Sequence, residues 1–255
     1  MTPSRAWALL LLLSFSVLCS AQGTPVRSPE AVTALNACSA AMGSHGIVDI
    51  AIWGRILNDN SVDSEQNFVI KTKGTGRVRN EITVQGRTFT NTFNFGRGKR
   101  SRSDRTEPER IPATLASYYR PEAVPALACV IDVTRPNVAI EYVRLEQVNG
   151  RWAHHIRFTA KSNRPDKAAI VELISDYHLF IDAETFLVLQ SQQRVFSPNG
   201  IENNSIWVSS FSDYRSVQGV LMPYHIERWA DGQKHSEMVI EAIQVNAGIS
   251  DAEFE

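Results

Sequence analysis

The sequence predicts a mainly β protein of the α+β class, in which one helix precedes an antiparallel sheet of about eleven strands. Apolar and polar residues alternate over most of the chain after residue 47, a pattern typical of strands that bury one face. Turn signals rich in Gly, Asn and Asp separate these runs. No Pro/Ser-rich linker or internal repeat interrupts them, so we expect a single mature domain over residues 22–255.

Composition and charge exclude several classes of protein. The chain has 255 residues, of which 43% are hydrophobic, as in ordinary globular proteins. Its 26 basic and 27 acidic residues give a formal net charge of −1, whereas nucleic-acid-binding proteins normally carry a basic excess. We therefore expect no nucleic-acid partner. Three Cys residues are too few for a small disulfide-rich scaffold.

Residues 1–21 predict a cleaved secretory signal peptide. Arg5 precedes an apolar run of about 14 residues, which is short of the roughly 20 needed to span a bilayer. Small residues then occupy the −3 and −1 positions of a cleavage site near Ala21. Two alternatives stay open: a retained anchor, and a lipoprotein signal acylated at Cys19, although Leu18 stands where such signals favour a small residue. We expect no transmembrane segment after cleavage.

Cleavage would leave an even pair of cysteines, Cys38 and Cys129. An exported chain is in a compartment that permits disulfides. A bond between them would close a loop of about 90 residues and contribute roughly 4 kcal/mol in the chain-entropy model. The alternative is a pair of buried free thiols, since Cys is among the most buried residue types.

A helix is predicted over residues 29–42. Ser28 is a natural N-cap, Pro29 suits the first helical position, and Gly43 ends the helix. Apolar residues recur at helical spacing along one face, namely Val32, Leu35, Cys38 and Met42.

Four alternating runs follow and predict an antiparallel meander with one solvated face. Turn-like segments at 74–76 and 85–87 separate three of these runs. The apolar members of the runs are Val48, Ile50 and Ile52; Phe68 and Ile70; Val78, Ile82 and Val84; and Phe89, Phe93 and Phe95.

Residues 97–128 interrupt the meander. A basic segment over 97–110 precedes short helices predicted at 112–119 and 121–127. About 30 residues without a strand pattern is long for a hairpin connection, and such insertions are often lids or binding loops. The basic segment is consistent with a solvated loop, and also with contact to anionic lipid headgroups or an acidic partner.

Seven further alternating runs complete the predicted sheet. Turn signals such as Asn149-Gly150 and Asp231-Gly232 separate them. The runs span residues 140–142, 152–158, 177–181, 186–196, 207–215, 222–226 and 239–245.

The sequence contains no local catalytic or metal-binding motif. Gly-x-Ser-x-Gly, His-Glu-x-x-His and Cys-x-x-Cys are all missing. His154 and His155 are adjacent, but neighbours on a strand point to opposite faces and cannot share one metal. We therefore predict no catalytic residue, no metal, no cofactor and no enzymatic activity. An enzyme whose site residues converge from distant parts of the chain is the remaining alternative.

Residues 177–255 resemble the C-terminal half of the LolA/LolB-like superfamily of bacterial outer-membrane lipoprotein-sorting proteins. The resemblance is carried by the order of short pieces along the chain. These pieces are Leu179-Phe180-Ile181-Asp182-Ala183-Glu184-Thr185, Phe211-Ser212-Asp213-Tyr214-Arg215, Gly219-Val220, Pro223, Asp231-Gly232, Ile243-Gln244-Val245-Asn246, Ile249-Ser250-Asp251 and Phe254.

The resemblance implies an unclosed antiparallel β half-barrel whose open side is plugged by the N-terminal helix and short helices. It also implies an apolar groove that holds acyl chains, in which each buried CH₂ contributes roughly 0.8 kcal/mol. A packed core is the alternative role for the same apolar side chains. The predicted lining residues are Ile50, Ile52, Phe68, Ile70, Phe89, Phe93, Trp152, Ile156 and Phe158.

We therefore expect an exported, periplasmic and non-catalytic binding protein that holds a lipid, a lipoprotein acyl chain or another amphiphile, as in outer-membrane lipoprotein sorting. Envelope proteins are further expected partners. The alternative function is an envelope scaffold or sensor module whose β-sheet mediates protein contacts. An exposed apolar patch or a free edge strand would favour that alternative.

Overall fold

The computed structural model describes residues 25–58, 65–197 and 200–255. The predicted signal peptide, with its cleavage site near Ala21 and the alternative acylation site Cys19, lies outside these residues. In the part that is described, no helix is both long enough and apolar enough to cross a membrane.

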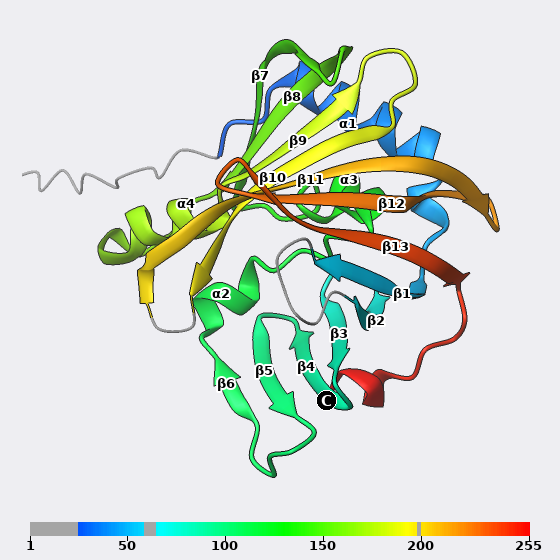
Figure 1. Cartoon of the computed structure of the whole chain (residues 1–255). Coiled ribbons are helices and arrows are strands. Elements are labelled where there is room, and N and C mark those ends of the chain that lie inside the picture. The colour runs from blue at the N-terminus through cyan, green and yellow to red at the C-terminus, as the bar shows by residue number, and fades with distance from the viewer. Residues whose placement is uncertain (1–24, 59–64, 198–199) are drawn as a thin grey trace, which may run out of the picture.

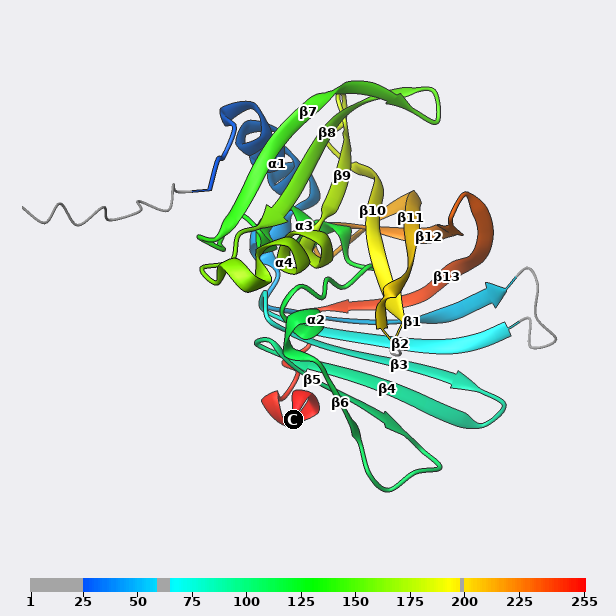
Figure 2. The ribbon, with the colours of Figure 1, turned by 90° about the vertical axis from the view of Figure 1, so that its left-hand side faces the viewer.

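Thirteen antiparallel strands of the described residues form one sheet that does not close (Figures 1 and 2). The strand order is β6-β5-β4-β3-β2-β1-β13-β12-β11-β10-β9-β8-β7. The two halves of the chain therefore meet where β1 pairs with β13, and the predicted class, a mainly β protein with some helix and an open half-barrel, is confirmed. The strands are β1 (Asp49–Asn58), β2 (Glu65–Lys73), β3 (Arg77–Val84), β4 (Arg87–Asn94), β5 (Arg97–Arg102), β6 (Glu109–Ile111), β7 (Val138–Val148), β8 (Arg151–Ala160), β9 (Tyr177–Asp182), β10 (Val188–Ser197), β11 (Gly200–Val217), β12 (Val220–Ala230) and β13 (Gln233–Val245).

Two strands, β5 and β6, were not expected. They lie in the basic segment that the sequence predicted as an irregular insertion, and they extend the meander beyond β4. Arg and Lys have little strand propensity, so the segment carries no strand signal of its own. Charged residues are nevertheless common on strands near the edge of a sheet, and β6 is an edge strand here.

The helices pack mainly on one face of the sheet. α1 (Pro29–Met42) matches the predicted helix and ends at Gly43, whose φ of 70° is the left-handed conformation that glycine adopts readily. α2 (Ala113–Ser117) lies within the first short helix predicted in the insertion. α3 (Pro125–Ile131) begins later than the second one, because Pro125 fits the first helical turn. α4 (Ala168–Ser175) was not predicted, although Val171, Ile174 and Ser175 lie buried at helical spacing.

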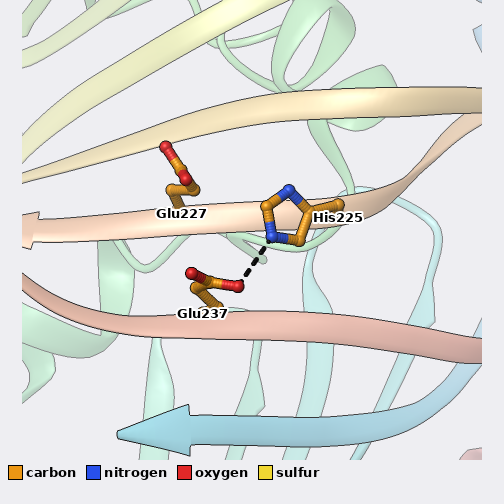
Figure 3. Close-up of side chains that lie close together, drawn as sticks. All are labelled: His225, Glu227 and Glu237. Carbon is orange, nitrogen blue, oxygen red and sulfur yellow. Dashed lines mark hydrogen bonds and ion pairs between the residues drawn. The ribbon is translucent and has the colours of Figure 1, made fainter. Parts of the chain in front are cut away.

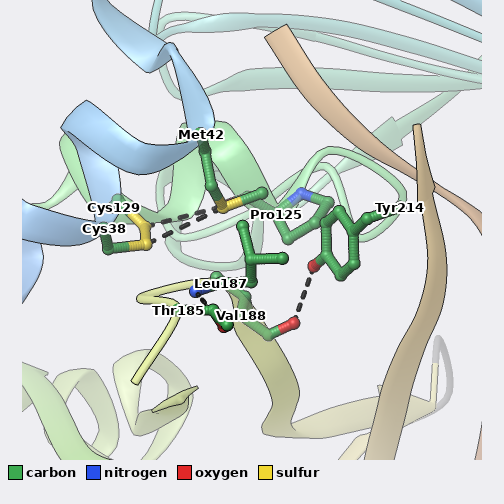
Figure 4. Close-up of a disulfide and its surroundings, with 8 residues drawn as sticks. All are labelled: Cys38, Met42, Pro125, Cys129, Thr185, Leu187, Val188 and Tyr214. Atoms are coloured by element: carbon green, nitrogen blue, oxygen red, sulfur yellow. Dashed lines mark hydrogen bonds between the residues drawn. A yellow bond between two sulfur atoms is a disulfide. The ribbon is translucent and has the colours of Figure 1, made fainter. Parts of the chain in front are cut away.

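The main hydrophobic core lies between α1, α3 and the concave face of the sheet (Figure 2). Leu35 and Met42 of α1 are fully buried against strand residues such as Ile52 and Leu179. A disulfide between Cys38 and Cys129 joins α1 to α3, with the two Cα atoms 6.4 Å apart (Figure 4). The two helices therefore form a cross-linked unit that fills one half of the barrel.

The C-terminal residues pack on the opposite face of the sheet. Phe254, in a short 3-10 helix (Asp251–Phe254), is buried against β3 and β4. Ion pairs from strand β2 hold this segment: Lys71 Nζ lies 2.9 Å from Glu253 Oε2, and Lys73 Nζ lies 2.6 Å from Asp251 Oδ1. Both lysines alternate with residues that face the core, so the C-terminus covers the outer face of the sheet.

Candidate functional site

Two cavities lie on the concave side of the sheet, on either side of α2. The larger has a volume of about 430 Å³ and lies between the β2–β3 turn, α2 and the segment that follows α3. The smaller has a volume of about 200 Å³ and lies between β4, β5, α2, α4 and β10. Phe93, Tyr118 and Tyr119 line both cavities and form the wall between them.

The wall is an aromatic stack between β4 and the residues that follow α2. The rings of Phe93 and Tyr119 lie face to face, with centroids 3.8 Å apart and planes 9° from parallel. The Tyr119 hydroxyl accepts a hydrogen bond from Nδ2 of Asn80 on the neighbouring strand β3. Burial raises the pKa of Tyr119 to about 12, so the wall stays uncharged at neutral pH.

The segment after α2 is anchored by buried charges. Arg120 Nη2 lies 2.7 Å from Asp132 Oδ2, and both side chains are almost completely buried. The Arg120 guanidinium also lies over the ring of Tyr177, 4.3 Å from its centroid. Glu122 accepts a hydrogen bond from the Ser209 hydroxyl, and its Oε1 lies 3.3 Å from Arg228 Nε on β12. Together with the disulfide, these contacts fix α3 to the barrel.

α2 itself is held by fewer contacts. It is five residues long, and Ala116 is its only buried residue. Ala116 packs in a small cluster with Val78 and Phe93 that is separate from the main core. Since α3 is cross-linked to α1 and α2 buries a single residue, α2 is attached to the barrel less firmly than α3.

The structure divides the predicted groove residues between the core and the cavities. Phe93 lines both cavities beside α2, and Phe89 lines a third cavity of about 430 Å³ beneath the basic segment. Trp152 lies at the start of β8 and is 54% exposed. The other six are packed in the main core beneath α1 and α3, which fill the groove at those positions: Ile50, Ile52, Phe68, Ile70, Ile156 and Phe158.

Sequence reasoning missed the residues that α2 and its flanks contribute. Tyr118, Tyr119, Leu115 and Ile111 line the 200 Å³ cavity, and all belong to the insertion between the two halves of the meander. The one signal that pointed to them was the length of that insertion, which is typical of lids and binding loops. No periodic pattern identified the individual side chains.

The adjacent histidines of β8 face opposite sides of the sheet, as expected. His154 Nδ1 lies 3.0 Å from the Tyr142 hydroxyl. His155 Nδ1 lies 2.5 Å from Glu146 Oε1, and its Nε2 lies 2.7 Å from His178 Nδ1. Each histidine therefore has a separate set of partners within the sheet.

One cluster of side chains on β12 and β13 has the composition of a metal site: His225, Glu227 and Glu237 (Figure 3). Their ligand atoms lie within 4.8 Å of one another. However, the Lys234 ammonium contacts Glu237 and lies 3.8 Å from Glu227 Oε1. Hydrogen bonds from Lys234 and His225 lower the pKa of Glu237. An internal cation already neutralises the carboxylates, so the cluster acts as an ion network that joins two strands.

The architecture defines an open β half-barrel with helices and cavities on its concave side. No family model and no curated protein matches the sequence. Among solved structures, a putative outer membrane lipoprotein-sorting protein domain from Vibrio parahaemolyticus matches at 10% identity, with 89% of this chain and 96% of that chain covered and a TM-score of 0.59.

Two further solved structures match at a similar level. A LolA superfamily protein from Nitrosomonas europaea has 12% identity, with 88% of this chain and 97% of that chain covered and a TM-score of 0.58. A DUF1329 family protein from Desulfovibrio piger has 13% identity, with the same 88% and 97% covered and a TM-score of 0.57. The chain therefore has the fold of LolA superfamily and lipoprotein-sorting proteins, and the resemblance noted in the sequence is confirmed for the fold.

Proposed function

We propose that this chain is an exported, non-catalytic carrier that holds the acyl chain of a lipid or lipoprotein on the concave side of its half-barrel. The observation that carries the proposal is the pair of cavities beside α2, separated by the stack of Phe93 on Tyr119. The cavities, of about 430 and 200 Å³, would join when α2 moves away from the sheet. Joined, they fall within the range typical of ligand sites.

The unequal attachment of the helices supports a carrier. A carrier must release its cargo, so the site needs a cover that moves without unfolding the barrel. α3 is fixed by the disulfide and the buried pair of Arg120 and Asp132, whereas α2 buries only Ala116. Movement of α2 would expose the cavities while the main core stays packed.

The chemistry of the lining supports a binding role. Among the described residues, no His, Asp or Glu lines either of the cavities beside α2. Their polar groups are hydroxyls, amides and guanidinium groups, which bind and orient a ligand but do not supply a general base of ordinary pKa. The disulfide and the predicted signal peptide support export to an oxidising compartment.

Lipid retention and uptake test this proposal. The protein is exported, purified without detergent and examined by native mass spectrometry, and uptake of a fluorescent fatty-acid probe is then measured. We expect co-purified lipid and saturable uptake. Val78→Phe places a ring in the larger cavity and should weaken uptake at least fivefold, while Val84→Phe, on the same strand but not lining that cavity, should not. A protein that carries no lipid and takes up no probe would exclude the carrier function.

A second candidate function, protein contact in the cell envelope, is favoured by one observation. Val143, Leu145 and Trp152 are exposed apolar residues of the β7–β8 hairpin, with 39%, 46% and 54% of their surfaces accessible. Clustered apolar exposure is typical of interaction sites. Replacement of Leu145 and Trp152 by Ser should abolish capture of an envelope protein if this hairpin is a docking site, and should leave probe uptake unchanged.

A further inference from the structure

Arg100 lies between two neighbouring cavities on the concave side of the sheet. It lies on β5 opposite Asn91 of β4, and its Nε donates a hydrogen bond to Asn91 Oδ1 at 3.0 Å. Phe89 and Phe93 share this face of β4, since they stand two residues either side of Asn91. Arg100 and Asn91 line both the 200 Å³ cavity beside α2 and the neighbouring cavity beneath the basic segment. The guanidinium is therefore at the junction of the two.

Two other cations of the basic segment are paired with carboxylates, whereas Glu107, which lines only the cavity beneath that segment, forms no ion pair among the described residues. Arg102 Nε lies 2.5 Å from Asp104 Oδ1, and Arg105 Nη1 lies 3.0 Å from Glu109 Oε1. Lys99, on the outer face, donates to the backbone carbonyl of Glu255. Among the described residues Arg100 makes no ion pair, although it is only partly exposed. Arg194 of β10 also lines the smaller cavity, and its Nη1 donates to Asn204 Oδ1 at 2.9 Å. Arg100 and Arg194 are thus the two cations of this cavity, and neither has a carboxylate partner in the part of the chain that the structure describes.

The rest of the smaller cavity is mostly apolar. Its apolar lining comes from β4, β6, α2, α4 and β10, and consists of Phe93, Ile111, Leu115, Ile174, Val195 and Phe196. The site therefore combines an apolar body with two guanidinium groups, of which Arg100 lies where this cavity meets the next one. A ligand that complements both parts has an alkyl chain and an anionic head. A neutral lipid would leave the half-buried guanidinium of Arg100 without an anion.

We propose that the concave site selects a single-chain amphiphile with a carboxylate head, whose head pairs with Arg100 and whose chain lies against the wall of Phe93 and Tyr119. The proposal rests on the proposed carrier function and specifies its substrate class. A carboxylate matches the planar fork of a guanidinium, which binds it through two parallel hydrogen bonds. A cavity of about 200 Å³ is small for a ligand site, which favours one chain over two.

Displacement of a neutral dye tests the head-group preference. Nile red, which carries no charge, is bound to the full exported chain and displaced with dodecanoate, dodecanol or dodecyltrimethylammonium, which share one alkyl length. We expect dodecanoate to displace the dye at about tenfold lower concentration than dodecanol, and the cationic amphiphile to be weakest. Arg100→Gln should bring dodecanoate and dodecanol to within twofold of each other. Arg100→Lys, which keeps the charge but loses the fork, should retain part of the preference.

The matched control is Arg97→Gln. Arg97 is an exposed residue of the same strand, three positions away and on the outer face, so its loss changes the net charge equally without touching the cavity. The head-group preference of Arg97→Gln should equal that of the unmodified protein. Equal displacement by dodecanoate and dodecanol in the unmodified protein, or an equal loss of preference in both variants, would overturn the head-group proposal while the carrier function stands. Failure of the protein to bind Nile red or any of the three amphiphiles would overturn both.

Discussion

Phe93 and Tyr119 stack face to face at a centroid distance of 3.8 Å, and this contact is part of the wall between the two cavities beside α2. Phe93 belongs to the sheet and Tyr119 to the segment that follows α2, so withdrawal of α2 must break the stack. An aromatic pair contributes roughly 0.5–1.5 kcal/mol beyond the burial of its surface. Opening of the concave site would therefore cost this stacking energy and, in addition, the burial of the Tyr119 ring against the cluster of Val78, Phe93 and Ala116.

Tyr119→Ala should join the two cavities permanently. We expect the free energy of unfolding to fall by about 2–4 kcal/mol, because a large buried ring is removed, and the rate of fatty-acid probe uptake to rise. Urea unfolding and stopped-flow fluorescence measure the two effects. Tyr119→Phe keeps the ring but removes the acceptor for Asn80, so it should lose only about 1 kcal/mol and take up the probe at the normal rate. Equal uptake rates in Tyr119→Ala and the unmodified protein would show that the stack does not limit opening.

Most of the sheet could be predicted from the sequence, because one buried face imposes a period of two. Ile52 on β1 pairs with Ile70 on β2 and with Ile243 on β13, and all three belong to runs that alternate clearly. β5 escaped prediction because Arg and Lys give no strand signal. Pairing with β4, rather than propensity, makes this segment extended.

The candidate site was harder to predict, because alternation identifies the buried face of a strand but not what covers it. Ile50 and Phe93 follow the same pattern, yet α1 and α3 fill the space over Ile50, whereas a cavity lies beside Phe93. Tyr119 comes from an insertion without periodicity. The unpaired state of Arg100 emerges only once its neighbours Arg102 and Arg105 are seen with their carboxylates.

Loss of the disulfide should destabilise the domain without closing the site. We expect Cys38→Ser combined with Cys129→Ser to lower the free energy of unfolding by about 2–4 kcal/mol, since the bond constrains a long loop in the unfolded chain. Thiol titration of the denatured mature protein should detect no free thiol before reduction and two afterwards. Thermal unfolding with and without reductant measures the loss of stability. Detection of two free thiols before reduction would contradict the bond between α1 and α3.

Replacement of only one partner in the buried ion pair of Arg120 and Asp132 should lower the free energy of unfolding strongly. Arg120→Met leaves Asp132 almost fully buried, with Arg135 Nη1 at 3.5 Å as a weaker partner. We expect a loss of about 3 kcal/mol in urea unfolding. Arg120→Met combined with Asp132→Asn removes the stranded charge and should recover part of this loss. If the double variant is as unstable as the sum of the two single variants, the two charges do not act as a pair.

Acid should weaken one ion network on the outer face of β8 and β9. Burial alone would raise the pKa of Asp176, but hydrogen bonds from His178 and Arg157 lower it to about 2; Arg157 Nε lies 2.7 Å from Asp176 Oδ1. A carboxylate whose pKa is lowered on folding stabilises the folded state above its unfolded pKa, near 4, and this contribution is lost as the pH falls from about 4 to 2. Asp176→Asn should therefore reduce stability by about 1 kcal/mol at pH 6, a value discounted for partial exposure. The difference from the unmodified protein should vanish near pH 2 in urea unfolding series.

Asp166→Asn, which removes an exposed carboxylate paired with Arg164, should leave stability unchanged across the same range. A difference for Asp176→Asn that persists undiminished at pH 2 would mean that its effect arises from packing and not from the charge.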